Sequence, residues 1–292
     1  GFTEMETLDS EAAAAFAKEV NVGQNIDIAS NGDVYNILLI GSDTRNGWYG
    51  NSDSMILASI NSQTKTIYMT SFMRDLYANI PNVGIRKLNS AYAVGGGPLL
   101  VSTIESNYRV DIDNYASVDF SSMANIIDLV GGVDLEVSTQ EAGYINMYLD
   151  EQCGLQGLNA SDYYVTGGGI THLNGNQAVG FARIRYTSRG NEHSDYGRTS
   201  RQREILVQLM QKARSLDATT LLAVVNNMLP LITHNIDAAT LTNLIANAPS
   251  YINYDIQTDR IPYDGLYSNL GEELVPDFEA TINRLHQTIY GN

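Results

Sequence analysis

The sequence predicts a mixed α/β domain in which helices cover a sheet. Segments with the apolar patterns of strands alternate with segments of helical period along the chain. The strands expected at residues 54–60 and 66–72 are joined by the short polar turn 61–64, which makes them an antiparallel hairpin. Alternating strands and helices favour a layered fold, and the hairpin requires a mixed sheet rather than a wholly parallel one.

The first half of the chain contains most of the expected strands. Residues 34–40 form a continuous apolar run with β-branched members, typical of a buried strand, and Gly41-Ser42-Asp43 ends it. A helix is expected to begin at Pro98, and a second helix to end at Gly131-Gly132. These two helices are expected to cover residues 98–107 and 121–130, and two further strands are expected at 115–118 and 133–137.

The second half begins with a segment of weak pattern. Residues 138–169 are interpreted as a long excursion whose end, at the three glycines 167–169, is flexible. Asn174 then caps a helix that continues through Phe181, and a longer helix is expected at about 197–214. The remainder predicts two or three amphipathic helices and one extended piece near residues 255–261.

The chain of 292 residues is expected to form one domain. Residues 1–33 are polar or alanine-rich, with a short helical stretch near 11–20, and are interpreted as a lead-in outside the core. The domain therefore covers residues 34–292, with 215–292 as its C-terminal helical part. No stretch is long and apolar enough to cross a membrane, because the best one, 221–232, is interrupted by two asparagines and a proline. Since the chain starts without methionine, signal peptide or anchor, we expect a trimmed fragment.

The distribution of charge indicates a local anion rather than a nucleic acid. The formal net charge is −16, which argues against DNA or RNA as a partner and is otherwise typical of a solubilising surface. There are thirteen arginines and only four lysines, and six of the arginines fall between residues 183 and 203. Arginine in such a cluster suggests bidentate recognition of phosphate or carboxylate. Cys153 is the single cysteine, so no internal disulfide is possible.

Two aspartates flank the loop that follows the first strand. Asp43 lies where this strand ends, and Asp53 lies just before the next one, so the loop between them can fold back and bring both carboxylates together. Two hard oxygen ligands near a phosphate are a typical arrangement for Mg²⁺. The alternative is that both are ordinary turn residues, because their neighbours are good turn formers.

The strongest signal from the residues alone is the segment 195–202, Asp-Tyr-Gly-Arg-Thr-Ser-Arg-Gln. On a helix, Arg198 and Gln202 fall on the same side as the apolar stripe that continues through Ile205, with Arg201 at its edge. An inward charge needs a partner or a ligand, and the first turn of a helix already favours an anion. Neutralisation by Asp195 is the structural alternative.

Other polar residues are less specific. Arg183 and Arg185 alternate with apolar residues, and on an extended segment they would share one face and line one cavity with the helix arginines. Arg74, which follows the strand at 66–72, and Lys87 are equally explained as surface charges. His172 and His193 are single, lack metal-ligand spacing and are interpreted as loop residues.

In their order along the chain, these segments resemble the LytR-CpsA-Psr family over roughly residues 34 to 214, and more loosely to the end. Each matching stretch is short, and their order and spacing together are specific. The matching stretches are Asn36-Ile37-Leu38-Leu39-Ile40-Gly41-Ser42-Asp43-Thr44-Arg45, Ser52-Asp53-Ser54-Met55-Ile56-Leu57, Ser71-Phe72-Met73-Arg74-Asp75, Lys87-Leu88-Asn89-Ser90-Ala91-Tyr92, Leu173-Asn174-Gly175-Asn176-Gln177-Ala178, Ala182-Arg183-Ile184-Arg185-Tyr186 and the segment 195–202.

The resemblance implies a single α/β domain with a mostly antiparallel central sheet, whose flanking helices enclose a hydrophobic channel for a polyprenyl tail. The implied enzyme is a Mg²⁺-dependent phosphotransferase that moves a glycopolymer, such as teichoic acid or capsule, from an undecaprenyl-pyrophosphate carrier to peptidoglycan. It implies a location on the outer face of the membrane, extracytoplasmic and tethered by an anchor that this chain does not contain. Nucleic acid is not an expected partner.

The resemblance also assigns roles to individual residues. Asp43 and Asp53 are the implied Mg²⁺ ligands and, with Arg74, Arg185 and Asp195, the implied catalytic residues; Asp195 orients the arginines. The residues expected to bind pyrophosphate are Arg45, Arg74, Lys87, Arg183, Arg185, Arg198, Arg201 and Gln202. One departure is Asn51, where the family usually has arginine, so a phosphate contact is lost or is supplied by another residue such as Arg45.

Three alternative functions stay open. Water in place of a sugar acceptor would make the enzyme a polyprenyl-pyrophosphate hydrolase. A non-catalytic regulator that binds polyprenyl phosphates is a second alternative, and the Asn51 departure favours it. A generic exported α/β domain is the third. Neither the general base nor the transferred polymer follows from the sequence.

Overall fold

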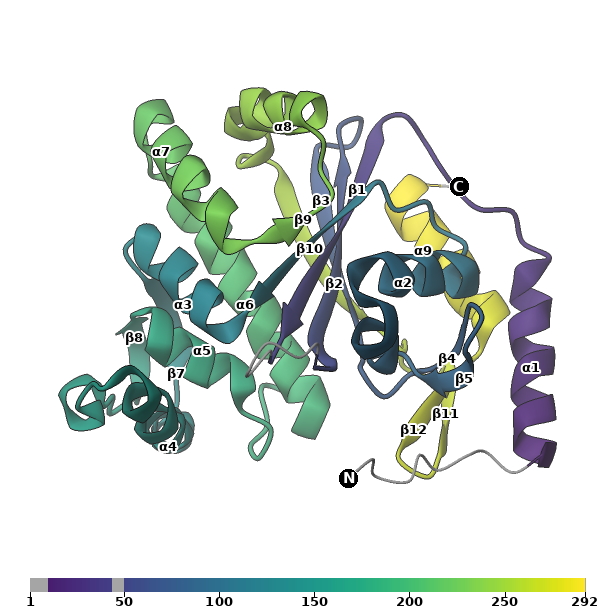
Figure 1. Cartoon of the computed structure of the whole chain (residues 1–292), viewed down its shortest axis with the longest axis horizontal. Coiled ribbons are helices and arrows are strands. Elements are labelled where there is room, and N and C mark those ends of the chain that lie inside the picture. Colours follow the sequence, from purple (N-terminus) through teal and green to yellow (C-terminus); the bar gives the residue numbers. More distant parts are fainter. Residues whose placement is uncertain (1–9, 44–49, 292) are drawn as a thin grey trace.

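A mixed sheet runs through the middle of the molecule (Figure 1). In the computed structural model, which describes residues 10–43 and 50–291, this sheet has six strands in the order β10-β3-β2-β1-β6-β9. The strands are β1 (Val34–Ser42), β2 (Ser52–Asn61), β3 (Thr66–Phe72), β6 (Asn114–Asp119), β9 (Thr233–His234) and β10 (Asp255–Ile261). Neighbours pair antiparallel except β1–β6 and β3–β10, which are parallel. The expected mixed and mostly antiparallel sheet is confirmed.

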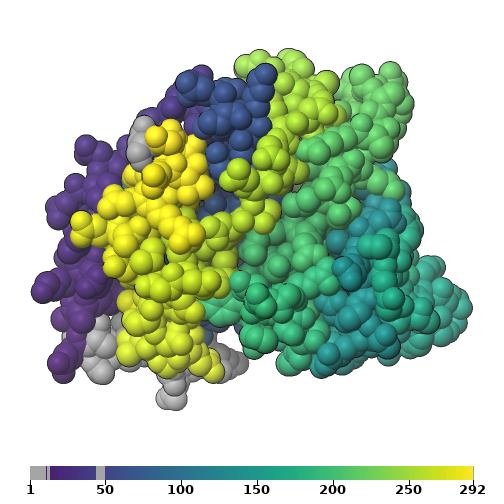
Figure 2. All heavy atoms as spheres, turned by 180° about the vertical axis from the view of Figure 1, so that it is seen from behind, coloured from purple at the N-terminus to yellow at the C-terminus, as the bar shows by residue number. Residues whose placement is uncertain are grey.

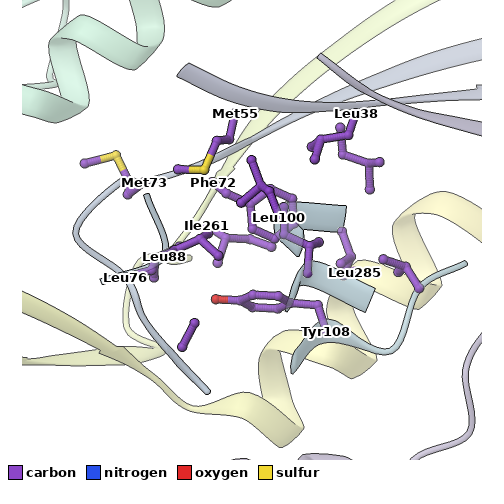
Figure 3. Close-up of a cluster of buried hydrophobic side chains, with 14 of the residues drawn as sticks. Leu38, Met55, Phe72, Met73, Leu76, Leu88, Leu100, Tyr108, Ile261 and Leu285 are labelled. Atoms are coloured by element: carbon purple, nitrogen blue, oxygen red, sulfur yellow. The ribbon is translucent and has the colours of Figure 1, made fainter. Parts of the chain in front are cut away.

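The main hydrophobic core lies on one face of this sheet, under α2 (Ser90–Tyr108) and α9 (Phe278–Tyr290). Figure 3 shows Leu38 and Met55 of the sheet pointing toward Leu100 and Tyr108 of α2 and Leu285 of α9. These side chains are almost fully buried, and each large apolar side chain buried in this way contributes about 1.5 to 3 kcal/mol. Gly95 and Gly96 inside α2 have non-helical backbone angles, so a short helical stretch precedes this kink and the longer part of α2 begins next to Pro98, where the sequence predicted a start.

The N-terminal helix belongs to this core. Helix α1 (Ser10–Gln24) packs against α9, and its Phe16 and Val20 are each only 2% exposed. The ring of Phe16 lies edge-on against Tyr77 and Phe278. Figure 2 shows α1 in purple beside the yellow C-terminal segment. The expectation that residues 1–33 lie outside the core is therefore wrong for α1, because a short apolar stripe in an alanine-rich helix is enough to bury it.

The other face of the sheet is covered by α3 (Phe120–Leu129), α5 (Gly175–Arg183) and α6 (Ser194–Arg214) (Figure 1). Beyond them lie α4 (Thr139–Gln156), the short η1 (Ala160–Tyr163) and the antiparallel pair β7 (Val133–Val137) and β8 (Gly169–Leu173). A second hydrophobic core, which includes Ile145, Phe181 and Ile205, holds α4, α5 and α6 together.

Residues 138–169 are not the excursion that the sequence predicted, because α4 occupies most of them. Ser138 and Glu141 form a capping box at its start: the Ser138 hydroxyl accepts from the Glu141 N–H, and the Glu141 carboxylate accepts from the Ser138 N–H. The apolar positions of α4 are sparse, which hid its period. Likewise, His172 lies in β8 rather than in a loop, where its ring meets Asp134 at 2.7 Å.

The C-terminal part is integral to the domain. It contributes β10 to the edge of the sheet, beside β3, and α9 to the main core. The three helices of this part that the structure describes are α7 (Ala218–Met228), α8 (Ala238–Tyr251) and α9, in agreement with the expected two or three. Neither α7 nor α8 has a fully buried residue. The remaining elements are β4 (Tyr77–Ile80), β5 (Gly84–Lys87), η2 (Leu229–Leu231), β11 (Tyr267–Leu270) and β12 (Glu273–Pro276).

Among the helices that the structure describes, none combines the length and the apolar character needed to span a bilayer.

Candidate functional site

The open end of the β1–β2 hairpin brings the two loop aspartates near each other. Ser42 at the end of β1 pairs with Ser52, and Gly41 pairs with Ser54, so Asp53 is the extra residue of a β-bulge. Asp43 follows Ser42 directly, and a Cβ on Gly50 would lie 2.7 Å from the Asp43 carbonyl oxygen, so the chain returns close to Asp43 before entering β2. The predicted folding back of this loop is confirmed at the backbone level. Residues 44–49, and with them Arg45, lie outside the described residues.

Three arginines and two carboxylates meet beside this hairpin, and we refer to Arg74, Arg185, Arg198, Asp53 and Asp195 as the arginine cluster. Arg74 follows β3, Arg198 and Asp195 lie in the first turns of α6, and Arg185 lies in the loop between α5 and α6. The Asp195 carboxylate is 2.8 Å from the Arg198 guanidinium, 3.3 Å from that of Arg185 and 3.8 Å from that of Arg74. Asp53 is 3.4 Å from Arg74 and 3.7 Å from Arg198. The three guanidinium groups outnumber these two carboxylates, and Asp75, 3.8 Å from Arg74, is itself paired with Lys87, so the charge of the cluster favours an anion.

The electrostatics of the cluster favour a ligand. Arg198 is only 5% exposed, and this burial lowers its pKa; neighbouring Arg74 lowers it further, whereas Asp195 opposes the shift. Although these groups form ion pairs, the buried Nε atoms of Arg74 and Arg198 and both carboxylate oxygens of Asp195 lack a hydrogen bond of good geometry within the described residues. Buried polar atoms without hydrogen bonds are costly, so an incoming anion that accepts from the arginines would be stabilised.

An apolar cavity of about 270 Å³ adjoins the cluster between the sheet and α3, α5 and α6. Its walls are almost entirely apolar and include Leu39 of β1, Met123 of α3 and Leu209 of α6. Gln202, one helical turn after Arg198, also lines it, as does Ser54, the neighbour of Asp53. The inward-facing side of α6 that the sequence predicted thus continues from the arginine cluster into the apolar cavity.

Two further predicted residues lie at the edges of the cluster. Lys87 of β5 pairs with Asp75 at 3.2 Å and approaches the glutamates of the β11–β12 turn, so it reaches the cluster only through Asp75, which also faces Arg74. Arg183 is the last residue of α5 rather than part of a strand, and the shared face expected for Arg183 and Arg185 is wrong. Its guanidinium pairs with Glu151 and lies over the rings of Phe120 and Tyr148.

Arg201 has a structural environment. Its side chain is fully buried, and its Nε lies 2.9 Å from the Glu141 carboxylate. The guanidinium also donates to the backbone carbonyls of Ile184, Thr187 and Ser188. Because these acceptors already surround it, the structure does not bring Arg201 to the cluster, and its assignment to pyrophosphate binding is corrected. It instead fixes the loop that carries Arg185.

Two residues of α4 were missed by sequence reasoning. The Tyr148 hydroxyl donates to the Arg183 carbonyl, and the Arg183 guanidinium lies over its ring. Burial raises the pKa of its phenol, and the positive charges of Arg183, Arg185 and Arg198 oppose this shift. Glu141 is the buried partner of Arg201. The signal that could have found α4 was the Ser138-to-Glu141 capping-box spacing.

The residues at the hairpin end suit a hard cation. Carboxylate oxygens are the ligands that Mg²⁺ prefers, and it commonly takes one or two of them from the protein and the rest from phosphate and water. The backbone at Gly50 passes close to the backbone of Asp43, so the two ends of the loop lie side by side. Within residues 10–43 and 50–291, no group of three His, Cys, Asp or Glu side chains is arranged to hold a metal. Asp43 and Asp53 are the two carboxylates that the described part of the hairpin end contributes, and such a pair would suit Mg²⁺ that is also bound by phosphate and water.

Replacing Arg198 with Met should separate ligand binding from stability. Asp195 keeps Arg185 and Arg74 as partners, so we expect the ligand-free protein to unfold at the same temperature or slightly higher. Binding of pyrophosphate should weaken by roughly 1.5 to 3 kcal/mol, the usual range for a hydrogen bond to a charged group. Thermal melts with and without pyrophosphate measure both effects, with Arg284→Met, which removes an exposed ion pair, as the control. A large loss of ligand-free stability with unchanged pyrophosphate stabilisation would contradict the assignment.

Comparisons with known proteins show the family to which the chain is similar. The LytR_cpsA_psr family model matches residues 3–284. A protein of Oceanobacillus iheyensis named polyisoprenyl-teichoic acid–peptidoglycan teichoic acid transferase TagU is 37% identical over 195 residues, which cover 64% of this chain and 54% of that protein. Regulatory protein MsrR of Staphylococcus aureus is 32% identical, over 69% of this chain and 56% of that protein. The chain thus spans about half the length of these relatives.

The fold is also shared with a solved structure of the LytR-CPS2A-psr family protein YwtF (TagT) with bound octaprenyl pyrophosphate lipid. The TM-score is 0.63 at 21% identity, over 93% of this chain and 96% of that one. The family model extends over nearly the whole chain, including α1, which the sequence alone had placed outside the domain. Because the family model covers nearly the whole chain, the chain belongs to the LytR_cpsA_psr family.

Proposed function

We propose that this chain is the catalytic domain of a Mg²⁺-dependent phosphotransferase that moves a glycopolymer from an undecaprenyl-pyrophosphate carrier to peptidoglycan. The observation that carries the proposal is that Ser54 and Gln202, the neighbours of Asp53 on β2 and of Arg198 on α6, line the apolar cavity, so the arginine cluster adjoins it. A lipid pyrophosphate has the same two parts, an anionic head and an apolar tail. The names of the relative TagU and of the lipid-bound neighbour support this substrate class.

The cavity supplies binding energy for the tail. Its apolar walls offer about 0.8 kcal/mol for each methylene group that a prenyl chain buries. The head group would then lie against Arg74, Arg185 and Arg198, whose guanidinium groups suit bidentate binding of phosphate oxygens. Two acceptor-only carboxylates, Asp53 and Asp195, hold these arginines in place before the ligand arrives.

The reaction is attack of a sugar hydroxyl on the phosphorus next to the glycan, with the lipid phosphate as leaving group. Such transfer needs in-line positioning and neutralisation of charge rather than a covalent intermediate on the protein. The three arginines stabilise the charge that develops on the phosphoryl oxygens, and Asp195 keeps them oriented. Asp43 and Asp53 would hold Mg²⁺, which supplies further neutralisation of the pyrophosphate when bound.

The test is turnover of a synthetic lipid-linked glycan donor with a peptidoglycan acceptor, with and without Mg²⁺. Transfer of the glycan to the acceptor that stops on chelation supports the proposal. Consumption of the donor without transfer would make the protein a polyprenyl-pyrophosphate hydrolase. Since the relative MsrR is named a regulator, and Asn51 replaces a usual arginine, a non-catalytic binder is the second candidate. Binding of the donor without any turnover would favour that candidate.

Filling the apolar cavity should block the lipid. Ala182 of α5 lines the cavity, and a tryptophan there would occupy part of its volume, at a stability cost of about 1 to 3 kcal/mol. We expect Ala182→Trp to weaken binding of a polyprenyl pyrophosphate at least about tenfold, which corresponds to the loss of two buried methylene groups. Binding of inorganic pyrophosphate should stay unchanged. The control is Ala246→Trp on the exposed side of α8. Equal lipid affinity in both variants would contradict the location of the tail.

We further propose that the domain works on the outer face of the cell membrane, where both substrates of this reaction meet. The comparisons support this location through the peptidoglycan acceptor in the relative's name.

A further inference from the structure

A second depression of about 270 Å³ adjoins the site next to the apolar cavity. We call it the acidic groove and define it by Asp43, Asp119, Phe120, Glu151, Gln152 and Arg183. Asp119 and Phe120 also line the apolar cavity, so the two depressions share a wall. Asp43 connects the groove to the hairpin end, where the reaction is placed. A molecule in the groove therefore lies beside the head group of a lipid whose tail fills the cavity.

The charge of the groove disfavours a second phosphate site. Apart from Asp43, the proposed Mg²⁺ ligand, the described residues of the groove place two carboxylates, those of Asp119 and Glu151, beside one arginine. That arginine, Arg183, is already paired with Glu151 at 3.3 Å and lies over the ring of Phe120. A polymer with phosphate in its repeating unit would be repelled from such a surface. An uncharged chain rich in hydroxyl groups would instead donate hydrogen bonds to the carboxylates.

The polar floor of the groove has an open hydrogen-bonding position. Gln152 is 8% exposed, and its Nε2 donates to the Asn176 side chain at 3.1 Å. Its Oε1 is buried and has no hydrogen-bond partner within the described residues. An unpaired buried carbonyl oxygen is costly, and a ligand hydroxyl or amide N–H would satisfy it after a small shift of the side chain. Gln156 and Asn176 exchange further amide hydrogen bonds beside it.

The rim of the groove adds an apolar contact. Leu155 of α4 lines it and is 76% exposed, which is unusual for a leucine on a helix packed against the domain. Phe120 provides an aromatic surface on the opposite element, α3. Apolar surfaces next to planar amides and carboxylates are the combination that suits a pyranose ring, which has C–H groups on its faces and hydroxyl groups on its edge.

From this geometry we infer that the acidic groove binds an uncharged, amide- and hydroxyl-bearing sugar of the acceptor glycan, and so presents the attacking hydroxyl to the lipid-linked phosphate. The inference rests on the proposed function and names the acceptor site for it. The alternative source of the same chemistry is the first sugar of the donor. The excess of carboxylates favours the acceptor, because the donor sugar is bonded directly to the pyrophosphate.

The test is binding of an uncharged N-acetylglucosamine oligosaccharide, together with turnover on the peptidoglycan acceptor. We expect both Gln152→Leu and Leu155→Ser to raise the Kd of this oligosaccharide, measured by NMR titration. For Gln152→Leu the increase should be about tenfold, the upper range for one neutral hydrogen bond. Met147→Ser, a change on α4 at a half-exposed residue outside the groove, is the matched control and should leave it unchanged. The KM of the acceptor should rise in parallel, with the KM of the lipid-linked donor unchanged.

The outcomes are distinguishable. An unchanged Kd in both groove variants, or no binding by the unaltered chain, overturns the inference. A rise in the KM of the donor instead of the acceptor overturns it in favour of the donor sugar. Oligosaccharide binding that depends on Gln152 and Leu155 supports the groove even if the chain never consumes the donor, in which case only the proposed transferase reaction fails. Thermal melts confirm that each variant is folded.

Discussion

Changing Asp43 or Asp53 to Asn is expected to reduce transfer of the lipid-linked glycan by at least about 100-fold, because a carboxylate ligand that neutralises phosphoryl transfer contributes several kcal/mol. The amide keeps the shape of the side chain and removes its charge. Both residues lie at the open end of the β1–β2 hairpin, where loss of one charge should change the free energy of unfolding by less than about 1 kcal/mol.

The two variants should differ in a second measurement. Asp53 faces both Arg74 and Arg198, so Asp53→Asn leaves the arginine cluster with three arginines and only Asp195. Binding of inorganic pyrophosphate without Mg²⁺ should therefore become tighter in Asp53→Asn. Asp33→Asn, at the opposite and exposed end of β1, is the control for both measurements. Full activity in both site variants, or activity of the unaltered chain in the presence of a chelator, would contradict the metal assignment.

Replacing Arg201 with Met is expected to destabilise the fold by about 3 to 5 kcal/mol, the usual cost of removing one partner of a buried ion pair. Arg201 is fully buried, and Glu141 is 2% exposed. The change would leave the carboxylate with Arg189 as its remaining partner, at 3.2 Å. It would also leave three backbone carbonyls of the loop after α5 without their donor. Chemical denaturation measures the loss.

Arg198→Met is the matched comparison, because Arg198 lies one turn earlier on α6 and is also buried. Its removal is expected to leave stability nearly unchanged, whereas that of Arg201 should not. Changing Glu141 to Leu together with Arg201→Met should recover part of the lost stability, because both charges then leave the interior. A loss below about 1 kcal/mol for Arg201→Met, well under the range for a buried pair, would show that the loop is held by other contacts.

This contrast bears on the mechanism as well. Arg185 lies in the same loop, between two of the carbonyls that Arg201 binds, those of Ile184 and Thr187. Arg201 and Glu141 therefore act on the site by fixing the position of Arg185 relative to Asp195. The sequence cluster of six arginines divides into those that face the site and those, such as Arg201, that build the wall behind it.

Local sequence patterns were sufficient for the longer strands of the central sheet, β1, β2, β3, β6 and β10, and for the position of the two aspartates at the ends of β1 and β2. The hairpin of β2 and β3 was predictable because strand period, turn composition and chain reversal all lie within some twenty consecutive residues. The inward direction of Arg198 and Gln202 was predictable for the same reason, since a helix repeats its faces within a few residues. These features depend on short-range geometry that each segment carries with it.

Tertiary contacts decided what each inward side chain meets. The helical period places Arg198 and Arg201 near the same stripe, but the partner of Arg201 is Glu141, sixty residues earlier on a helix whose weak pattern hid it. Arg183 and Arg185 were expected on one face of a strand, and the end of α5 between them turns them to different partners, Glu151 and Asp195. Likewise, a stripe of two apolar residues cannot show that α1 packs on α9.

The apolar cavity and the acidic groove were the least predictable from the residues. Their walls come from the sheet and from helices far apart in the chain, such as α3, α4, α5 and α6. An apolar side chain that lines a cavity has the same sequence signature as one that fills a core, because both follow the period of their helix or strand. Sequence therefore determined which faces turn inward, and only the packing of those faces decided where they meet closely and where they leave space for a ligand.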